Sequence, residues 1–475
     1  MEANKLFTIP NEITKDNFEN AMDQAIALEL ATIPTYLYTY YSIKRSQDQN
    51  IILKNILTQN PAIAHEKAQE MAIEALVYAN KSAALIMSVV IEEMLHLALS
   101  SNVKQAICRK GPVLVETAQT LSFPTKLDGH QPEFPINLAK YSLKQLKTFL
   151  QIESPNAFQE PPQLRAFEPI KYKTIGDFYD MIVRCINDNY PGPYAPCAQL
   201  LPDKGYYAQN SINTVYYDKD HKPRFASDDD SGDLIGVVDK NTAIVALNAI
   251  IEQGEGHRGG SELHFNPVTG MPIPLPMDDK GNVIYSPEDY DDSGKLELSH
   301  FAKFMEAYTL GDYYTGKFAE IGVDFFGLIV YNQPENPKQS NYSGELADIN
   351  ELGNALFTYL ILMVESCYYL EQSTQFKVFM YGIHKSMIWL LSEIGNDINR
   401  TPYQNQDGGL SFEYFSFENK DGKRPKQIII DLAGKLADKD PKSWGWLKTA
   451  KNYLPSLPDV GLDYSVIPNV PEIPA

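Results

Sequence analysis

The side chains of this chain that could do chemistry are glutamates and histidines set in apolar sequence. In VVIEEMLHLALS, Glu93 and His96 are three positions apart, and KLELSHFAKFMEAY repeats that spacing with Glu297 and His300. Residues at i and i+3 project from one face of a helix, so each pair could hold one metal ion. Carboxylates and imidazoles suit iron or manganese, whereas thiolates would indicate zinc or an iron–sulfur cluster.

Two further stretches each offer a carboxylate. Glu29, in AMDQAIALELATIPTY, has mostly apolar neighbours one turn away, so its buried charge would need a cation beside it. Glu252 and Glu255, in IVALNAIIEQGEG, lie at the end of an apolar helix, and their spacing does not decide which of them is the main ligand. Taken singly, each residue has a plain alternative: an Arg or Lys partner for Glu29, a solvated helix end for Glu255, and a satisfied core histidine for His300.

Together the four stretches run Glu, Glu-x-x-His, Glu, Glu-x-x-His along the chain. Dinuclear carboxylate centres in four-helix bundles use this set, with one glutamate from each of two helices and a Glu-x-x-His from each of the other two. The set predicts a dinuclear metal centre, and its ligand types do not distinguish iron from manganese. Tyr36 and Tyr40, which follow Glu29, are candidates for a hydrogen bond beside it.

Helical periodicity predicts the elements that would hold these residues. We expect bundle helices near 15–43, 80–107, 241–255 and 295–308, with the second region broken near Asn80, and extra helices over 350–397. Residues 111–240 are rich in proline and predict a loop-rich insertion between bundle helices 2 and 3, with one helix capped by Thr174. The proline-rich segment 416–475 predicts a C-terminal extension that is partly extended.

The composition argues against two classes of binding partner, nucleic acids and membranes. The 475 residues carry a net charge of −20, so nucleic-acid phosphates and anionic membrane surfaces would repel the protein. The four cysteines form no Cys-x-x-Cys pair, and the N-terminus has no signal-peptide pattern. We therefore expect a cytoplasmic protein that binds neither nucleic acid nor membranes. The sequence leaves a homo-oligomer open.

Four segments resemble the ferritin-like domain family that includes the ferritin-like part of the iminophenyl-pyruvate dimer synthase of violacein biosynthesis and of chromopyrrolate synthase. They are LELATIPTYLYTYYSI, VVIEEMLHLALSSNV, IIEQGEG and ELSHFAKFME, and the likeness covers most of residues 15–415. The resemblance implies an all-α ferritin-like bundle as a domain over residues 1–415. It also implies these metal ligands, with Glu252 similar to the extra carboxylate of rubrerythrin-like sites: Glu29, Glu93, His96, Glu252, Glu255, Glu297 and His300.

The same resemblance implies a metal-dependent oxidoreductase. We expect a di-iron oxidase or oxygenase that acts with O₂ on a small, amino-acid-derived substrate in secondary metabolism. Three alternatives remain: a haem-dependent oxidative coupling enzyme with His96 or His300 as axial ligand, a manganese catalase, and a non-catalytic iron-binding protein.

Overall fold

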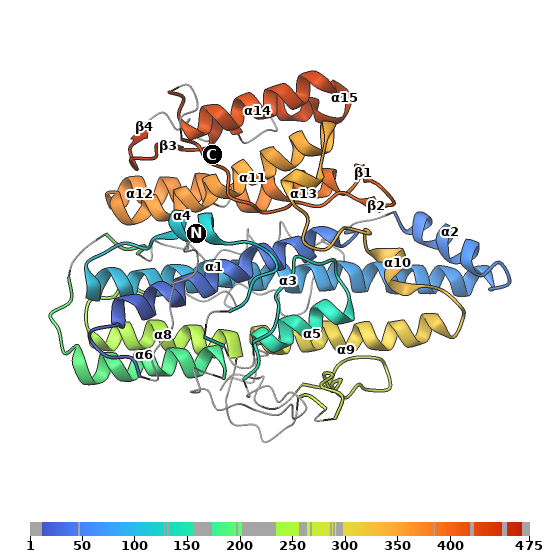
Figure 1. Cartoon of the computed structure of the whole chain (residues 1–475). Helices are drawn as coiled ribbons and strands as arrows, with labels where there is room; N and C mark the ends of the chain where they lie inside the picture. The colour runs from blue at the N-terminus through green and yellow to red at the C-terminus, as the bar shows by residue number, and fades with distance from the viewer. Residues whose placement is uncertain are drawn as a thin grey trace.

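The computed structural model describes residues 12–45, 48–127, 129–130, 133–155, 173–195, 198–201, 234–255, 264–266, 268–285, 287, 290, 298–383, 385–418, 422–448 and 454–467. Within these ranges 63% of the residues are helical, and the helices are stacked in layers (Figure 1). Strands are limited to two short antiparallel pairs in the described part of the chain. The predicted all-α class is confirmed.

Two long antiparallel helices form the middle layer, α1 (Phe18–Ser42) and α3 (His65–Cys108). Both are buried along most of their length because helices pack above and below them. The predicted break near Asn80 is wrong, since α3 runs through it without interruption. The polar residues there are accommodated in the packing: Asn80 is buried, and the Lys81 ammonium forms an ion pair with buried Glu306.

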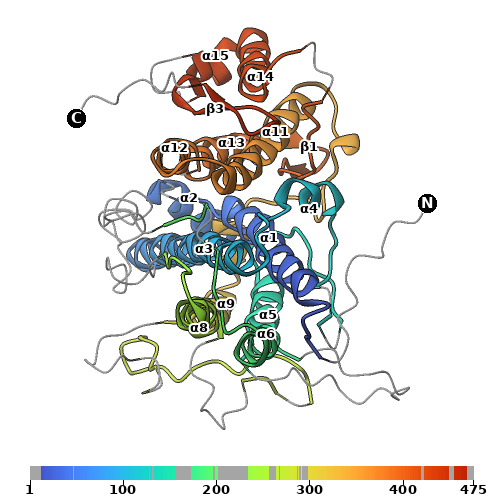
Figure 2. The same ribbon diagram turned by 90° about the vertical axis from the view of Figure 1, so that its left-hand side faces the viewer.

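The lower layer contains two rows of shorter helices. In one row α8 (Lys240–Glu255) is followed by α9 (His300–Ala319), and in the other α6 (Ile175–Asn189) lies alongside α8 while α5 (Leu143–Ile152) lies alongside α9 (Figures 1 and 2). The helix capped by Thr174 is therefore confirmed as α6. Residues 111–240 do more than form a loop-rich insertion, because α5 and α6 from this stretch pack against the bundle.

Local features of the sequence explain why α5 forms a helix, although prolines on both sides of it masked the pattern. The Ser142 hydroxyl accepts a hydrogen bond from the backbone N–H of Gln145 and caps the helix. Leu146, Phe149 and Leu150 follow at helical spacing and are fully buried against the bundle.

The upper layers come from the C-terminal half of the chain. α11 (Gly344–Ser366), α12 (Gln372–Val378) and α13 (Leu391–Ile398) form the layer above α1 (Figure 1), and α13 contacts α1 directly. Two π-helical turns, η4 (Phe379–Ile383) and η5 (Lys385–Leu390), lie between α12 and α13. α4 (Leu114–Thr120) packs between α1 and α11. α14 (Pro425–Lys439) packs on the outer side of α11 and is followed by α15 (Pro441–Trp444).

The described part of the predicted, partly extended C-terminal segment contains a long helix, α14. Pro425 occupies the first turn of α14, where its missing N–H costs no helical hydrogen bond. Ile428, Ile429 and Leu436 then bury one face of this helix.

The remaining elements are α2 (Gln49–Gln59), α10 (Phe325–Ile329), η2 (Gln339–Asn341), η3 (Cys367–Tyr369), η6 (Gly445–Lys448), η7 (Leu454–Ser456), β1 (Pro402–Tyr403), β2 (Gln406–Asp407), β3 (Asp459–Val460) and β4 (Val466–Ile467).

One described helix, α3, has the length and hydropathy that crossing a membrane would need. However, 94% of its most apolar window is buried inside the structure. Its apolar character is explained by its place at the centre of the bundle, where α1, α2, α8, α9 and α10 all contact it.

Candidate metal centre

The candidate site lies where helix ends in the lower layer face the middle of α1 and α3. α8 ends and α9 begins near it, and Glu153, the residue that caps the C-terminus of α5, faces it as well. Ser299 caps α9 by accepting a hydrogen bond from Ala302 N–H, which makes His300 the first residue of that helix. The ends of three helices and two continuous helices thus supply side chains to one buried place.

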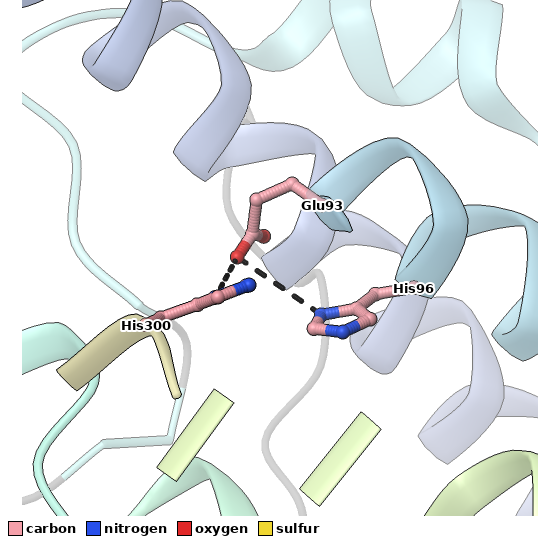
Figure 3. A group of neighbouring side chains, drawn as sticks. All are labelled: Glu93, His96 and His300. Atoms are coloured by element: carbon pink, nitrogen blue, oxygen red, sulfur yellow. Dashed lines mark ion pairs between the residues drawn. The ribbon is translucent and has the colours of Figure 1, made fainter. Parts of the chain in front are cut away.

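Glu93 is the centre of this group. Its Oε1 lies 2.9 Å from Nδ1 of His300 and 4.0 Å from Nδ1 of His96 (Figure 3). The planes of the two imidazole rings are inclined by 25°, and the ring centroids lie 5.0 Å apart. All three side chains are almost completely buried, and their ligand atoms lie within 4.8 Å of one another.

Each histidine also has a second carboxylate beside the same ring nitrogen. Glu29 Oε2 lies 3.7 Å from His96 Nδ1, and Glu153 Oε2 lies 3.5 Å from His300 Nδ1. The site therefore has two halves, one with His96 and Glu29 and the other with His300 and Glu153. Glu93 is common to both halves.

Hydroxyl groups hold the carboxylate oxygens that point away from the histidines. Tyr179 on α6 donates a hydrogen bond to Glu29 Oε1, and Tyr36 on α1 donates one to Glu153 Oε1. Thr32 lies 2.6 Å from Glu93 Oε2 and can donate to it. Each of the three central carboxylates is thereby oriented with one oxygen toward the histidines.

The outer nitrogens of the histidines are oriented too. His96 Nε2 lies 3.0 Å from the side-chain oxygen of Gln253, and His300 Nε2 lies 2.9 Å from Glu92 Oε2. The Lys303 ammonium lies 2.6 and 2.7 Å from the two oxygens of Glu92 and compensates its charge. The Gln253 oxygen favours the tautomer of His96 that carries its proton on Nε2, which leaves Nδ1 of His96 free to bind a metal.

The buried charges perturb one another strongly. Burial, together with the neighbouring charges of Glu153 and Glu29, raises the pKa of Glu93 to about 7. Burial would lower the pKa of His300, but its three carboxylate neighbours outweigh that effect and raise the pKa well above the usual value. Burial likewise opposes the charged form of His96, and Glu29 overcomes it and raises that pKa. The carboxylates thus attract positive charge, whether protons or a metal ion.

A family comparison adds to this geometry. A model of the ferritin-like family matches residues 22–309, which is more than half of the chain and includes every side chain described above. The chain belongs to the ferritin-like family. It is similar to the crystal structure of a ferritin like protein from Caulobacter vibrioides, with 19% identity, a TM-score of 0.40, and coverage of 81% of this chain and 98% of that chain. No curated protein matches the sequence.

In this ferritin-like chain the structure brings together four of the side chains proposed from sequence, namely Glu29, Glu93, His96 and His300. It does not bring Glu252 to them, because that side chain is exposed to solvent whereas the group is buried. The neighbouring Gln253 faces His96 instead. Among the described side chains of α8, the one that contacts His96 is therefore an amide and not a carboxylate.

Two other proposed ligands fall outside what the structure describes. Glu255 is the last residue of α8, and its side chain is not among the described ones; Glu297 precedes the described range that starts at residue 298. α9 begins only at His300, so the helix on which a Glu-x-x-His pair was expected starts at the histidine. Of the two tyrosine candidates, Tyr36 reaches the site, whereas Tyr40 stacks against the Arg45 guanidinium.

Sequence reasoning missed Glu153, Tyr179, Lys303 and Gln253. The sequence could have pointed to Lys303, because it lies three residues after His300 on an apolar helix. A buried lysine needs a carboxylate partner. Tyr179 lay in the helix predicted from Thr174 but among several apolar residues. Glu153 ends a short helix within a stretch expected to be loop, so no periodic pattern identified it.

The donor set and its spacing fit a metal centre of the type that ferritin-like bundles hold. Bonds of about 2.0–2.2 Å place atoms that share one ion roughly 3–4 Å apart, and the nitrogen–oxygen distances here are 2.9–4.0 Å. Neither ring nitrogen of His300 makes a well-directed hydrogen bond, although a carboxylate oxygen lies 2.9 Å from each. A cavity of about 20 Å³ adjoins the group and is lined by Glu29, Glu93, His96, Glu153 and Tyr179, which is room for a water-sized species.

Proposed function

We propose that this protein is a metal-dependent oxidoreductase whose centre holds two first-row transition-metal ions, iron or manganese. The observation that carries the proposal is the position of Glu93, whose Oε1 faces Nδ1 of both His96 and His300 in a buried site. One carboxylate between two metal-competent imidazoles is what a dinuclear centre in a helical bundle needs. The carboxylate and imidazole donors favour iron or manganese.

Such a centre, when loaded, would bind O₂ and pass electrons to it, so that O₂ could serve as the oxidant of a substrate. The residues of the chain have separate tasks in that chemistry. Tyr179 and Tyr36 hold carboxylates in place and, because burial raises the pKa of both hydroxyls well above the usual value, keep their protons. Leu28, Ile250 and Ile251 line the adjoining cavity and would exclude water from the metal-facing side.

We propose a small organic substrate, derived from an amino acid and oxidised in secondary metabolism in the cytoplasm. The support is the resemblance of the QGEG and Glu-x-x-His segments to the ferritin-like part of iminophenyl-pyruvate dimer synthase and chromopyrrolate synthase. A haem held between both His96 and His300 is not supported, because the centroids of the two rings lie only 5.0 Å apart. A haem with one of them as its axial ligand remains the alternative, and a Soret band would reveal it. Manganese catalase chemistry uses similar donors, and peroxide disproportionation would distinguish it from oxidase activity.

Removal of a central ligand tests the proposal. His96→Ala and the near-isosteric Glu93→Gln should each lower the iron or manganese bound after anaerobic loading to well under half, because each change deletes a donor atom from the shared position. Metal is measured by plasma mass spectrometry after desalting. Glu252→Gln is the matched control, since its side chain is exposed on α8, and it should bind as much metal as the unaltered protein. Full metal retention in both His96→Ala and Glu93→Gln would refute the proposed centre.

A further inference from the structure

Glu153 contributes to the site from outside the segments that carry the family resemblance. It caps the C-terminus of α5, and its side chain is buried. Its Oε2 lies 3.5 Å from His300 Nδ1, and a Cβ atom added at Gly254 on α8 would lie 3.6 Å from the same oxygen. The carboxylate therefore sits between the start of α9 and the end of α8, on the metal-facing side of His300.

The surroundings of Glu153 repeat those of Glu29. Both carboxylates face a histidine Nδ1 with one oxygen and accept a tyrosine hydrogen bond with the other. Both also share Glu93 as a neighbour. If the half with His96 and Glu29 holds a metal ion, the half with His300 and Glu153 has the same three kinds of contact.

The charges near His300 argue against a purely structural ion pair. Glu29, Glu92, Glu93 and Glu153 are all buried, and Lys303 supplies one positive charge. Even with both histidines protonated, these described groups would keep one net negative charge, which is unfavourable in a buried site without a further proton or cation. A metal ion beside His300 and Glu153 would offset this negative charge.

We propose that Glu153 is a ligand of the second metal ion together with His300, and that Tyr36 is the positioning residue that holds its carboxylate. This inference rests on the proposed dinuclear centre and adds to it a ligand from the stretch 111–240. Among the described carboxylates, Glu29 would then serve the half with His96 and Glu153 the half with His300, while Glu93 faces both histidines.

Glu153→Gln tests the ligand directly, because the amide keeps the size of the side chain but removes the charged donor. Anaerobic titration with Fe²⁺ or Co²⁺, followed by equilibrium dialysis and plasma mass spectrometry, should give about two ions per chain for the unaltered protein and one or fewer for Glu153→Gln. Magnetic coupling between the two ions should be lost at the same time. Far-UV circular dichroism must show that the variant retains its helix content, and Glu252→Gln again serves as the control that keeps two ions.

Tyr36→Phe tests the positioning role without touching a ligand. Loss of the hydroxyl that donates to Glu153 should weaken the second ion about 10–100-fold, as expected for an outer hydrogen-bond partner of a ligand. Tyr40→Phe is the matched control, since Tyr40 lies one turn further along α1 and contacts Arg45. It should leave both dissociation constants unchanged.

The outcomes separate this inference from the proposed function. Two coupled ions in the unaltered protein and unchanged binding in Glu153→Gln would overturn the role of Glu153 and leave the dinuclear centre intact. No metal in the unaltered protein would overturn the centre itself, and the inference with it. Equal effects of Tyr36→Phe and Tyr40→Phe would overturn the positioning role of Tyr36.

Discussion

Two adjacent glutamates on α3 have opposite electrostatic surroundings. Burial raises the pKa of Glu92, but the charge of Lys303 and the contact with His300 outweigh it and bring the pKa below its usual value. Glu93 contacts His300 instead of a lysine, and burial with Glu153 and Glu29 nearby outweighs that contact and raises the pKa of Glu93 to about 7. Glu92 is therefore suited to orient His300, whereas Glu93 remains available to a metal ion.

Lys303→Met should destabilise the metal-free protein by about 3–5 kcal/mol, because it leaves the buried Glu92 without its cation. Lys317→Met on the same helix is the control. Lys317 pairs with Glu74 at a partly exposed position, and its loss should cost at most about 1 kcal/mol. Urea unfolding monitored by circular dichroism gives both values. Equal losses of unfolding free energy in the two variants would contradict the assigned role of Lys303.

At this scale the sequence was informative where a residue belonged to a spaced pair on a long helix. Glu93 and His96 share one continuous helix, so their spacing correctly predicted their proximity. Glu153 lies on no such pattern, because a helix end can direct a side chain into a site without any periodic signal. Gln253 rather than Glu252 reaches His96, since one position along a helix rotates a side chain by about 100°.

At the scale of elements, the site forms where helices of the lower layer begin and end. The end of α8, the start of α9 and the end of α5 all meet there, whereas α1 and α3 pass by without a break. Long periodic helices such as α1 and α3 could be predicted from sequence. The short α5 could not, because its apolar repeat spans only ten residues within a proline-rich stretch.

Close packing of α9 gives a prediction at this scale. A Cβ atom at Gly311 would overlap the Tyr78 hydroxyl oxygen and lie 3.1 Å from Leu143 Cδ2. We expect Gly311→Ala to destabilise the protein by about 1–3 kcal/mol, because the Tyr78 ring is held by hydrogen bonds to Tyr141 and the Ala307 carbonyl.

Gly316→Ala provides the control on the same helix. Gly316 has no neighbouring atom within 4 Å of its Cβ position, so the substitution should stabilise the helix by about 0.5–1 kcal/mol. Thermal unfolding of both variants measures the difference. A Gly311→Ala protein as stable as Gly316→Ala would contradict the packing of α9 against Tyr78.

At the scale of the whole molecule, the layers separate the site from solvent. α11 to α13 cover one side of α1, and the α5–α6 and α8–α9 rows cover the opposite side of the α1–α3 pair (Figures 1 and 2). The sequence predicted the helical class and the C-terminal helices because these segments are long and strongly apolar. It did not predict α14, whose apolar face is short and flanked by prolines. The domain boundary at residue 415 stays a prediction.

The most direct test of the central claim is the metal content of the unaltered protein, with a visible spectrum of the same sample. After anaerobic loading with Fe²⁺ and desalting, plasma mass spectrometry should find about two iron ions per chain, and the spectrum should have no Soret band. Two ions would agree with Glu93 lying between His96 and His300. A Soret band, or no bound metal after loading, would contradict a dinuclear non-haem centre in this protein.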